Sequence, residues 1–236
     1  MSDPDADVLI IGGGVAGLAA AQELSAAGSR VIVLEARGRL GGRIHTHREK
    51  GSMVPIELGA EFVHGKSPEL FRIVDSAKLL LCDVTSRHLF LRDKSLIKED
   101  EFWDRLNELM DQMKEAGSRD SSFQDFLDSL PDTEETRETK SIASMYVEGF
   151  HAARTERIGV RGLIKANDAA ERIDGDKQFR LVGGYDGVVD WLALQAKQHE
   201  AILHLNTVVR EVHWSRRHVE LTCNSQERSR PTSSML

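Results

Sequence analysis

An apolar run at residues 8–11 that passes directly into a glycine-rich turn limits most strongly what this chain can fold into. Gly12, Gly14 and Gly17 match the G-x-G-x-x-G spacing, in which the first glycine permits a tight turn and the second lets the backbone approach a pyrophosphate. The third lets the following helix pack closely on the strand. A helix that starts here directs its unpaired N–H groups at the phosphates. The segment therefore predicts a strand, a turn and a helix that together bind a dinucleotide.

The residues that follow supply the context that such a motif needs. The spacing of apolar residues predicts a helix over 16–27, and Gly28 suits the position just after a helix. A second apolar run at 31–34 ends at Glu35, which lies 18 residues after Gly17, near the roughly 20 expected for the acid that binds the adenosine ribose. The alternative is a generic strand-helix-strand unit in which Glu35 is a solvated residue at a strand end.

A second glycine-rich segment narrows the family. Residues 35–43, E-A-R-G-R-L-G-G-R, resemble a loop of the flavin-dependent amine oxidases. In that family the glycines wrap the cofactor, and the arginine that matches Arg43 lies near its phosphates. Protoporphyrinogen oxidases and phytoene desaturases carry a similar loop, so the resemblance implies FAD more firmly than it implies an amine substrate. The alternative is an ordinary glycine-rich turn with a surface arginine.

The next block also resembles this family. Residues 56–65, I-E-L-G-A-E-F-V-H-G, are similar to a segment of polyamine and monoamine oxidases that lies along the flavin, with its later residues facing the substrate. Two residues depart from the commonest polyamine-oxidase pattern. Phe62 replaces a tryptophan, and Glu61 replaces a small or neutral polar residue. Both departures concern the identity of the substrate more than that of the cofactor.

Two later blocks extend the resemblance. Residues 179–187 are similar to a segment that precedes a helix, and residues 205–212 are similar to a strand in which the residue matching Val209 contacts adenine through its backbone. The resemblance thus implies FAD as the cofactor and a set of cofactor-binding residues drawn from all of these blocks. These are Gly12, Gly14, Val15, Ala16, Gly17, Glu35, Ala36, Arg37, Gly41, Gly42, Arg43, Leu58, Gly59, Ala60, Glu61, Phe62 and Val209.

Glu61 and His64 are the side chains expected to meet the substrate and act as catalytic residues, because their block lies beside the flavin in the family. Glu61 would attract a cationic amine, and His64 would form a hydrogen bond or exchange a proton near neutral pH. The alternative is that both are structural or cofactor-facing polar residues. His45 and His47 form an H-x-H pair, but two ligands without a third are weak support for a metal, and we expect no metal site.

The expected fold class is α/β: a Rossmann-like FAD-binding domain with a mainly helical portion of a substrate domain, truncated relative to the family. Residues 1–65 form the first part of the FAD-binding domain, and residues 66–180 form the substrate-domain portion. The chain returns to the FAD-binding domain at 181–223. The segment 224–236 is polar and rich in serine and arginine, so it is expected to be disordered.

Local patterns predict further elements in both parts. Phe102, Leu106, Leu109 and Met113 repeat along one face of a helix, and we assign that face to the core. The expected helix starts lie near 120–122 and 131–135, further helices are expected over 157–170 and 185–199, and extended segments at 202–205, 208–214 and 218–222.

Composition sets limits on partners and location. The 236 residues carry a net charge of −7, which argues against nucleic acid as a partner, because phosphate binding favours a basic face. Cys82 and Cys223 are too few for a disulfide scaffold and indicate a reducing compartment. The acidic start lacks the basic region of a signal peptide, and no apolar run approaches the roughly 20 residues of a membrane span. We therefore expect a cytoplasmic protein without nucleic-acid or membrane partners.

Together these features predict an FAD-dependent oxidoreductase that oxidises the carbon–nitrogen bond of a polyamine-like amine. The resemblance implies hydride transfer to the flavin, with molecular oxygen as acceptor and hydrogen peroxide as product. The match covers the N-terminal half of the family pattern, so a second subunit that supplies the other half is one expectation. Two alternatives are another FAD oxidoreductase, of the desaturase or protoporphyrinogen-oxidase type, and a catalytically inactive FAD-binding fragment.

Overall fold

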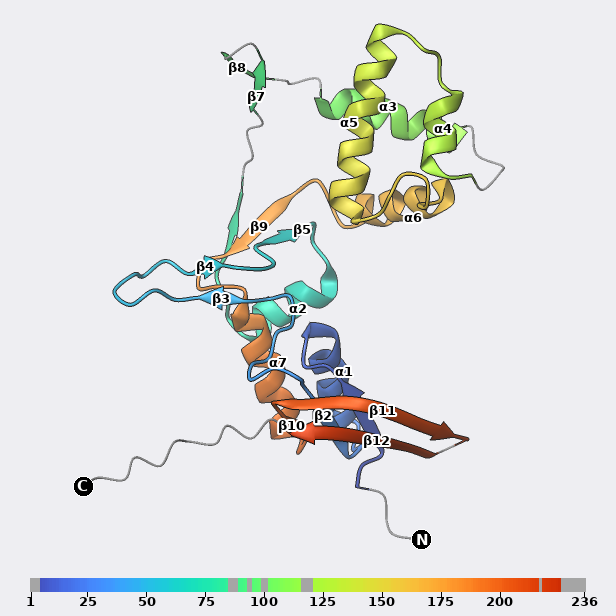
Figure 1. The fold of residues 1–236 in the computed structure, drawn as a ribbon. Coiled ribbons are helices and arrows are strands. Elements are labelled where there is room, and N and C mark those ends of the chain that lie inside the picture. Colours follow the sequence, from blue (N-terminus) through green and yellow to red (C-terminus); the bar gives the residue numbers. More distant parts are fainter. Residues whose placement is uncertain are drawn as a thin grey trace, which may run out of the picture. The chain divides into compact units, whose positions relative to one another are not determined.

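The computed structural model describes residues 5–84, 89–92, 95–98, 102–115, 121–216 and 218–225. The chain divides into two compact units (Figure 1). Unit 1 comprises Met1–Val63, Ser67–Asp83 and Phe179–Leu236, and unit 2 comprises His64–Lys66 and Val84–Gln178. Unit 1 therefore combines segments that lie far apart in the sequence.

Unit 1 contains a three-stranded parallel sheet in which β2 lies between β1 and β10. The strands are β1 (Val8–Ile11), β2 (Val31–Leu34) and β10 (Ile202–His204). Val8 lies opposite Val31, and Ile202 lies opposite Ile32, so the carboxyl ends of all three strands meet at one edge of the sheet. Parallel strands are usually covered on both faces, which explains the uninterrupted apolar run of β2.

Two helices of unit 1, α1 (Val15–Ala26) and α7 (Asp186–Gln198), pack against each other beside this sheet (Figure 1). Leu18 of α1 is buried together with Val188 and Leu192 of α7 in one apolar cluster. The predicted helices 16–27 and 185–199 are confirmed, with bounds that differ by one residue at each end.

Shorter elements complete unit 1. The antiparallel pairs are β3 with β4 and β11 with β12, and β9 lies between β5 and β6 in a second three-stranded sheet. The bounds are β3 (Thr46–His47), β4 (Ile56–Glu57), β5 (Phe62–His64), α2 (Pro68–Ser76), β6 (Leu81–Asp83), β9 (Gln178–Leu181), β11 (Thr207–Ser215) and β12 (His218–Ser225). The boundary between the two units falls within β5 and within β9.

The ribbon β11–β12 is longer than the predicted strands 208–214 and 218–222. Thr207 pairs with Ser225 and Val208 with Asn224, so both strands continue beyond the predicted bounds. The expectation that disorder begins at residue 224 is therefore wrong for Asn224 and Ser225, because strand pairing orders them. The rest of the predicted disordered segment, 226–236, lies outside the described residues.

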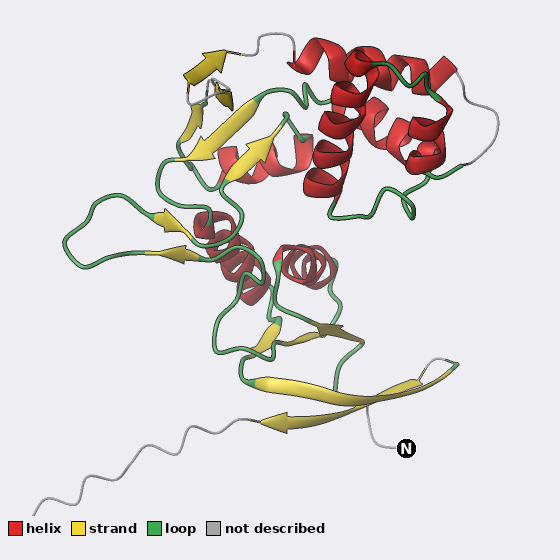
Figure 2. Cartoon of the chain, turned by 45° about the horizontal axis from the view of Figure 1, so that its top comes forward, coloured by secondary structure: helices red, strands yellow, loops and turns green. Residues whose placement is uncertain are grey.

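Unit 2 is mainly helical within its described residues, as Figure 2 shows. Its elements are the hairpin β7 (Leu89–Arg92) and β8 (Ser95–Lys98) and the helices α3 (Phe102–Glu115), α4 (Phe123–Ser129), α5 (Glu134–His151) and α6 (Val160–Glu171). The hairpin is absent from the predicted elements. Two short apolar runs flank the polar residues 92–95, a pattern that favours two paired strands over a helix.

The helices of unit 2 share one apolar core. Leu106, Leu109 and Met113 of α3 are buried together with Phe123 of α4. This confirms the predicted apolar face for these three α3 residues. The side chain of Phe102, the fourth residue of the pattern, lies outside the described part.

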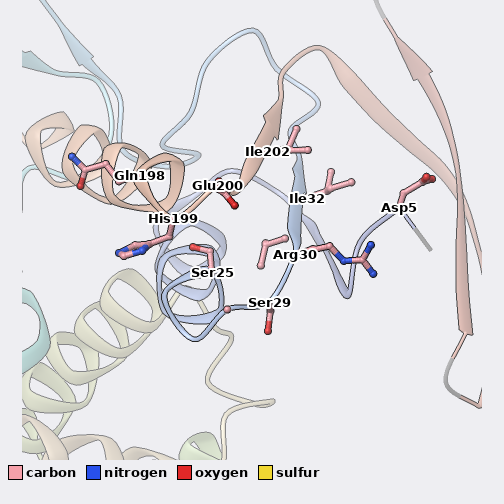
Figure 3. Close-up of a pocket in the computed structure, with 11 residues that line it drawn as sticks. Asp5, Ser25, Ser29, Arg30, Ile32, Gln198, His199, Glu200 and Ile202 are labelled. Atoms are coloured by element: carbon pink, nitrogen blue, oxygen red, sulfur yellow. The ribbon is translucent and has the colours of Figure 1, made fainter. Parts of the chain in front are cut away.

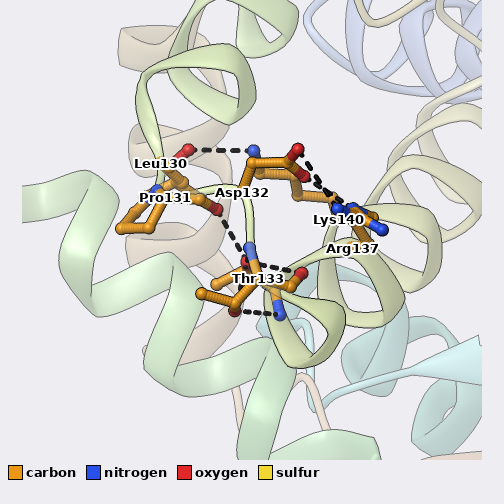
Figure 4. A network of polar contacts seen from close by, with 7 residues as sticks. Leu130, Pro131, Asp132, Thr133, Arg137 and Lys140 are labelled. Atoms are coloured by element: carbon orange, nitrogen blue, oxygen red, sulfur yellow. Dashed lines mark hydrogen bonds and ion pairs between the residues drawn. The ribbon is translucent and has the colours of Figure 1, made fainter.

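Capping interactions explain where α4 and α5 begin. Ser122 Oγ accepts a hydrogen bond from the Asp125 N–H at 3.0 Å, and the Asp125 carboxylate accepts one from the Ser122 N–H at 3.2 Å. Thr133 and Thr136 form the equivalent box at α5, where the Thr136 hydroxyl also donates to the Pro131 carbonyl (Figure 4). Both predicted helix starts are therefore confirmed.

Candidate functional site

The glycine-rich turn connects the carboxyl end of β1 to α1. Gly12 has a φ of +105°, which favours glycine, so the predicted tight turn is present. A Cβ on Gly17 would lie 2.0 Å from the Gly12 carbonyl oxygen, so a larger residue would force the helix away from the turn. A Cβ on Gly14 would meet the Gly42 Cα at 3.9 Å and nothing closer, which leaves open space beside Gly14.

The N-terminus of α1 begins at this turn without a side-chain cap. Gly14 occupies the N-cap position and offers no side-chain oxygen, and the first turn carries no acidic residue. The Leu18 N–H donates to the Gly14 carbonyl at 2.9 Å, which is the first hydrogen bond of the helix. The N–H groups of Val15 and Ala16 therefore remain suited to an anion, which the helix dipole favours.

Glu35 is buried at the carboxyl end of β2, with 7% of its surface exposed. One carboxylate oxygen, Oε2, accepts from the Gly13 N–H at 2.7 Å, and the other, Oε1, accepts from the Arg37 N–H at 2.8 Å. The carboxylate is thus fixed on the glycine-rich turn. Glu35 is therefore not the solvated residue at a strand end that was the alternative interpretation of the sequence. Each oxygen has a second acceptor position, so the fixed carboxylate has the capacity to accept from two hydroxyl groups.

The loop after β2 contains three arginines with different environments. Arg39 is half-buried and donates to the carbonyl oxygens of Leu40, Gly42 and Ile44. Arg37 and Arg43 are exposed, and within the described ranges neither guanidinium group has a hydrogen bond or an ion pair. Arg37 and Arg43 thus remain suited to binding phosphate, whereas the Arg39 guanidinium is occupied by backbone acceptors. This role of Arg39 was not predicted from the sequence.

The segment 58–60 is held against the same loop. The Leu58 N–H donates to the His45 carbonyl at 2.8 Å, and the Ala60 N–H donates to the Arg43 carbonyl at 3.1 Å. A Cβ on Gly59 would lie 2.0 Å from the Arg43 carbonyl oxygen, so only glycine permits this close contact.

The start of β11 lies beside the end of β2. The Thr207 N–H donates to the Glu35 carbonyl at 2.9 Å, and the Asn206 N–H donates to the Arg37 carbonyl at 3.0 Å. Val209 follows two residues later and is half-buried. All residues of the predicted cofactor-binding set belong to unit 1.

A partly exposed polar network, which was not predicted from the sequence, ties β3 and β4 to the start of α7. Glu57 accepts from the Thr46 hydroxyl and from the Tyr185 N–H, both at 2.7 Å. Arg48 forms an ion pair with Asp186 at the first residue of α7 and holds the pKa of that carboxyl below its usual range. Burial, followed by the negative charge of Glu57, raises the pKa of Tyr185.

The two predicted catalytic residues belong to different units. Glu61 lies in unit 1, where its carboxylate forms an ion pair with Arg180 at 3.1 Å. His64 lies in unit 2, where its ring stands edge-on to Phe150 with the ring centroids 5.6 Å apart. Phe150 in turn stacks on Tyr146, with centroids 5.4 Å apart. Glu61 is therefore paired, and His64 belongs to an aromatic group.

His45 and His47 lie at β3, where His47 contacts Glu49 at 3.3 Å on the surface. Among the residues that the structure describes, no cluster of three or more histidine, cysteine, aspartate or glutamate side chains has the arrangement of a metal site. The same part of the chain holds no helix with the length and apolar character needed to cross a membrane.

A pocket of about 430 Å³ opens at the other edge of the parallel sheet, where β2 and β10 begin (Figure 3). Its lining includes Asp5, Arg30 and Glu200, together with the last residues of α1 and α7. The pocket contains none of the predicted cofactor-binding residues. Its acidic side chains and helix C-termini favour cations over phosphate.

Comparison with protein families places this geometry in context. The family described as "Flavin containing amine oxidoreductase" matches residues 15–232. Polyamine oxidase 2 of Arabidopsis thaliana is 28% identical over 213 residues, a match that covers 79% of this chain and 42% of that protein. Probable polyamine oxidase 4 of the same plant is 52% identical over 62 residues, which cover 26% of this chain and 12% of that protein.

Solved structures share the fold. The chain resembles cyclohexylamine oxidase from Brevibacterium oxydans IH-35A with a TM-score of 0.73 and 22% identity over 95% of this chain and 56% of that one. It resembles a putrescine oxidase bound to putrescine with a TM-score of 0.72 and 21% identity over 93% of this chain and 55% of that one. The chain thus spans less than two thirds of each of these relatives and has the fold of their matched part, which confirms the expected α/β class.

Proposed function

Because the chain belongs to the family of flavin-containing amine oxidoreductases, we propose that unit 1 binds FAD through its adenosine and pyrophosphate portion. The observation that carries this proposal is the buried Glu35 carboxylate, which two backbone N–H groups fix at the carboxyl end of β2. Ligands of open parallel sheets bind outside the carboxyl ends of the strands, at the edge where Glu35 lies.

The residues present fit this group. Glu35 accepts from the ribose hydroxyls, and the N–H groups at the start of α1 donate to no side-chain cap, so they are available to the pyrophosphate. The open space beside Gly14 admits the phosphates, and Arg37 and Arg43 supply positive charge. We assign adenine to the backbone of Val209 and the flavin ring to the segment 58–62, following the family resemblance.

Bound FAD would supply the two-electron acceptor for oxidation of a carbon–nitrogen bond, with molecular oxygen as final acceptor and hydrogen peroxide as product. We propose an amine substrate of the polyamine type, which the names of the related polyamine and putrescine oxidases support. His64 would form a hydrogen bond with the substrate or exchange a proton with it. Glu61 would attract a cationic amine, which competes with Arg180 for the carboxylate.

A second candidate is a chain that binds FAD without turning over an amine. The proposed nucleotide contacts all lie in unit 1, so FAD binding requires nothing from unit 2. In this case a second polypeptide would complete the substrate site. Measurement of hydrogen peroxide release with putrescine and spermidine separates the two candidates once FAD binding is established.

The visible absorption spectrum of the purified chain tests the proposal. Flavin bands that pass into the filtrate after denaturation and ultrafiltration would support non-covalent FAD binding, and Glu35→Gln should weaken these bands. Glu23→Gln is a matched control, because Glu23 is an exposed residue of α1 whose carboxylate forms an ion pair with the exposed Arg72 of α2. A colourless chain that takes up no added FAD would contradict the proposal.

A further inference from the structure

One side chain organises the loop 39–44. Arg39 Nη1 donates to the carbonyl oxygens of Leu40 and Ile44, each at 3.1 Å, and Nη2 donates to the Gly42 carbonyl at 3.0 Å. Three backbone acceptors from five consecutive residues therefore converge on a single guanidinium group. A guanidinium has the planar fork of donors that such convergence requires, whereas a lysine ammonium is a compact point charge.

The three hydrogen bonds fix the direction of three peptide planes, those that follow Leu40, Gly42 and Ile44. In a planar trans peptide, the carbonyl of one residue and the N–H of the next point in opposite directions. The Leu40 carbonyl turns toward Arg39, and the Gly41 N–H of the same peptide donates to the Gly13 carbonyl at 2.8 Å. The Gly42 carbonyl also turns toward Arg39, so the Arg43 N–H points away from Arg39.

The loop is also fixed against the glycine-rich turn. Gly41 and Gly42 both have positive φ values, +100° and +59°, and a Cβ on Gly42 would lie 3.3 Å from the Gly14 Cα. This conformation is costly for residues other than glycine, so the two glycines let the loop adopt it, and the Arg39 hydrogen bonds hold the loop in it. The same bonds turn the Leu40 and Gly42 carbonyls toward Arg39. The partial negative charges of these two oxygens are therefore paired with the guanidinium group.

We propose that Arg39 is a positioning residue for the dinucleotide. It holds the loop against the glycine-rich turn, so that the Arg43 N–H and side chain are presented to a phosphate, and it does not itself contact the ligand. This proposal rests on the proposed binding of FAD. The three arginines of the loop then have two different roles. Arg37 and Arg43 supply positive charge to the ligand, and Arg39 holds the loop in the conformation that binds it.

The test compares Arg39→Lys and Arg39→Met with Arg43→Met in the full chain. FAD dissociation constants are measured by flavin fluorescence at several salt concentrations, below the unfolding temperature of each variant. We expect both Arg39 variants to bind FAD roughly tenfold more weakly, as for loss of about 1.4 kcal/mol. Their affinity should keep the salt dependence of the wild type, whereas Arg43→Met should reduce it, because a charge next to the phosphate is lost.

Hydrogen exchange of the ligand-free chain provides a second readout. Amides of 40–45 should exchange faster in Arg39→Lys and stay unchanged in Arg43→Met. Wild-type affinity in Arg39→Lys, or a reduced salt dependence in Arg39→Met that equals that of Arg43→Met, would overturn the positioning role. If the wild type itself binds no FAD, the proposed function fails first; if the wild type binds and Arg39→Lys binds equally well, only the inference about Arg39 fails.

Discussion

The two edges of the parallel sheet in unit 1 differ in charge, although the same strands and helices form both. At the carboxyl edge lie the uncapped start of α1, the fixed Glu35 carboxylate and the exposed Arg37 and Arg43. At the amino edge, the ends of α1 and α7 surround a pocket of about 430 Å³ together with Asp5, Arg30 and Glu200. The presence of a pocket is therefore a poor guide here; the uncapped N–H groups of α1 and the exposed arginines identify the edge suited to phosphate.

Displacement of α1 from the glycine-rich turn should have the largest effect on the carboxyl edge of the sheet. In Gly17→Val, the Cβ of the valine would lie 2.0 Å from the Gly12 carbonyl oxygen, so the helix has to move away from the turn. We expect a loss of about 3 kcal/mol in the stability of unit 1, as for overpacking that shifts the backbone, and loss of FAD binding. Urea unfolding, followed by fluorescence in a background where Trp103 and Trp214 are replaced by phenylalanine so that Trp191 on α7 is the reporter, measures the first effect.

Gly162→Ala in α6 is the matched control, because a Cβ there meets no atom within 4 Å. Alanine is the better helix former, so this variant should be stabilised by up to about 1 kcal/mol in unit 2. Equal stability of Gly17→Val and the wild type would show that the helix does not need this close contact.

The next effect concerns the ligand more than the fold. In Glu35→Gln one charged acceptor is lost, and the amide N–H₂ faces either the Gly13 or the Arg37 N–H. We expect FAD affinity to fall roughly tenfold to a hundredfold, in line with hydrogen bonds to charged groups. Isothermal titration with FAD checks this, and an unchanged dissociation constant would remove Glu35 from the site.

A smaller effect is expected on the pH dependence of stability. The Arg48 guanidinium lowers the pKa of Asp186 in the folded chain below the unfolded value of about 3.9. A lowered carboxyl pKa stabilises the fold above the unfolded pKa, and this stabilisation is lost as the pH falls through the folded pKa. We expect about 1 kcal/mol or less, because Arg48 is half exposed to solvent.

Asp186→Asn should therefore lower stability at pH 6 and flatten the decline between pH 5 and pH 3, about one unit on either side of the unfolded pKa. Asp190→Asn is the control with the opposite sign, since burial and then the Asp186 charge raise the pKa of Asp190. Removal of that carboxylate should raise stability near neutral pH. Identical pH profiles for both variants would contradict the assignment.

The smallest effect is expected at the amino edge. Arg30→Met removes an exposed ion pair with Asp7, in which the side-chain atoms lie 2.9 Å apart. Surface ion pairs contribute little to stability, and the pair lies at the edge away from the glycine-rich turn. The FAD dissociation constant should stay that of the wild type. A clear loss of FAD affinity would show that the two edges are not functionally distinct.

Local sequence patterns predicted much of unit 1. The helix α1, the strand β2 and the helix α7 follow from apolar periodicity, and the role of Gly17 in close packing is confirmed by the contact its Cβ would make. These features depend on residues that are near each other in the sequence. The same holds for the helix starts of unit 2, where Ser122 and Thr133 cap their own helices.

Contacts between residues far apart in the sequence could not be predicted from local patterns. Nothing in the run of arginines indicates that Arg39 collects the backbone carbonyls while Arg43 stays exposed, because the choice depends on how Gly41 and Gly42 turn the loop. The pairing of Glu57 with the Tyr185 N–H joins residues 128 positions apart. Arg180, the partner of Glu61, is also far from it in the sequence, and it changes the charge that a substrate would meet.

Hydrogen exchange of the chain with and without FAD tests the central claim most directly, because it reports on both edges of the sheet in one experiment. If FAD binds at the carboxyl edge, amides of 12–18 and 35–44 should gain protection, while amides of 28–32 and 198–202 at the amino edge stay unchanged. Protection confined to the amino edge, or none at either edge at saturating FAD, would contradict it.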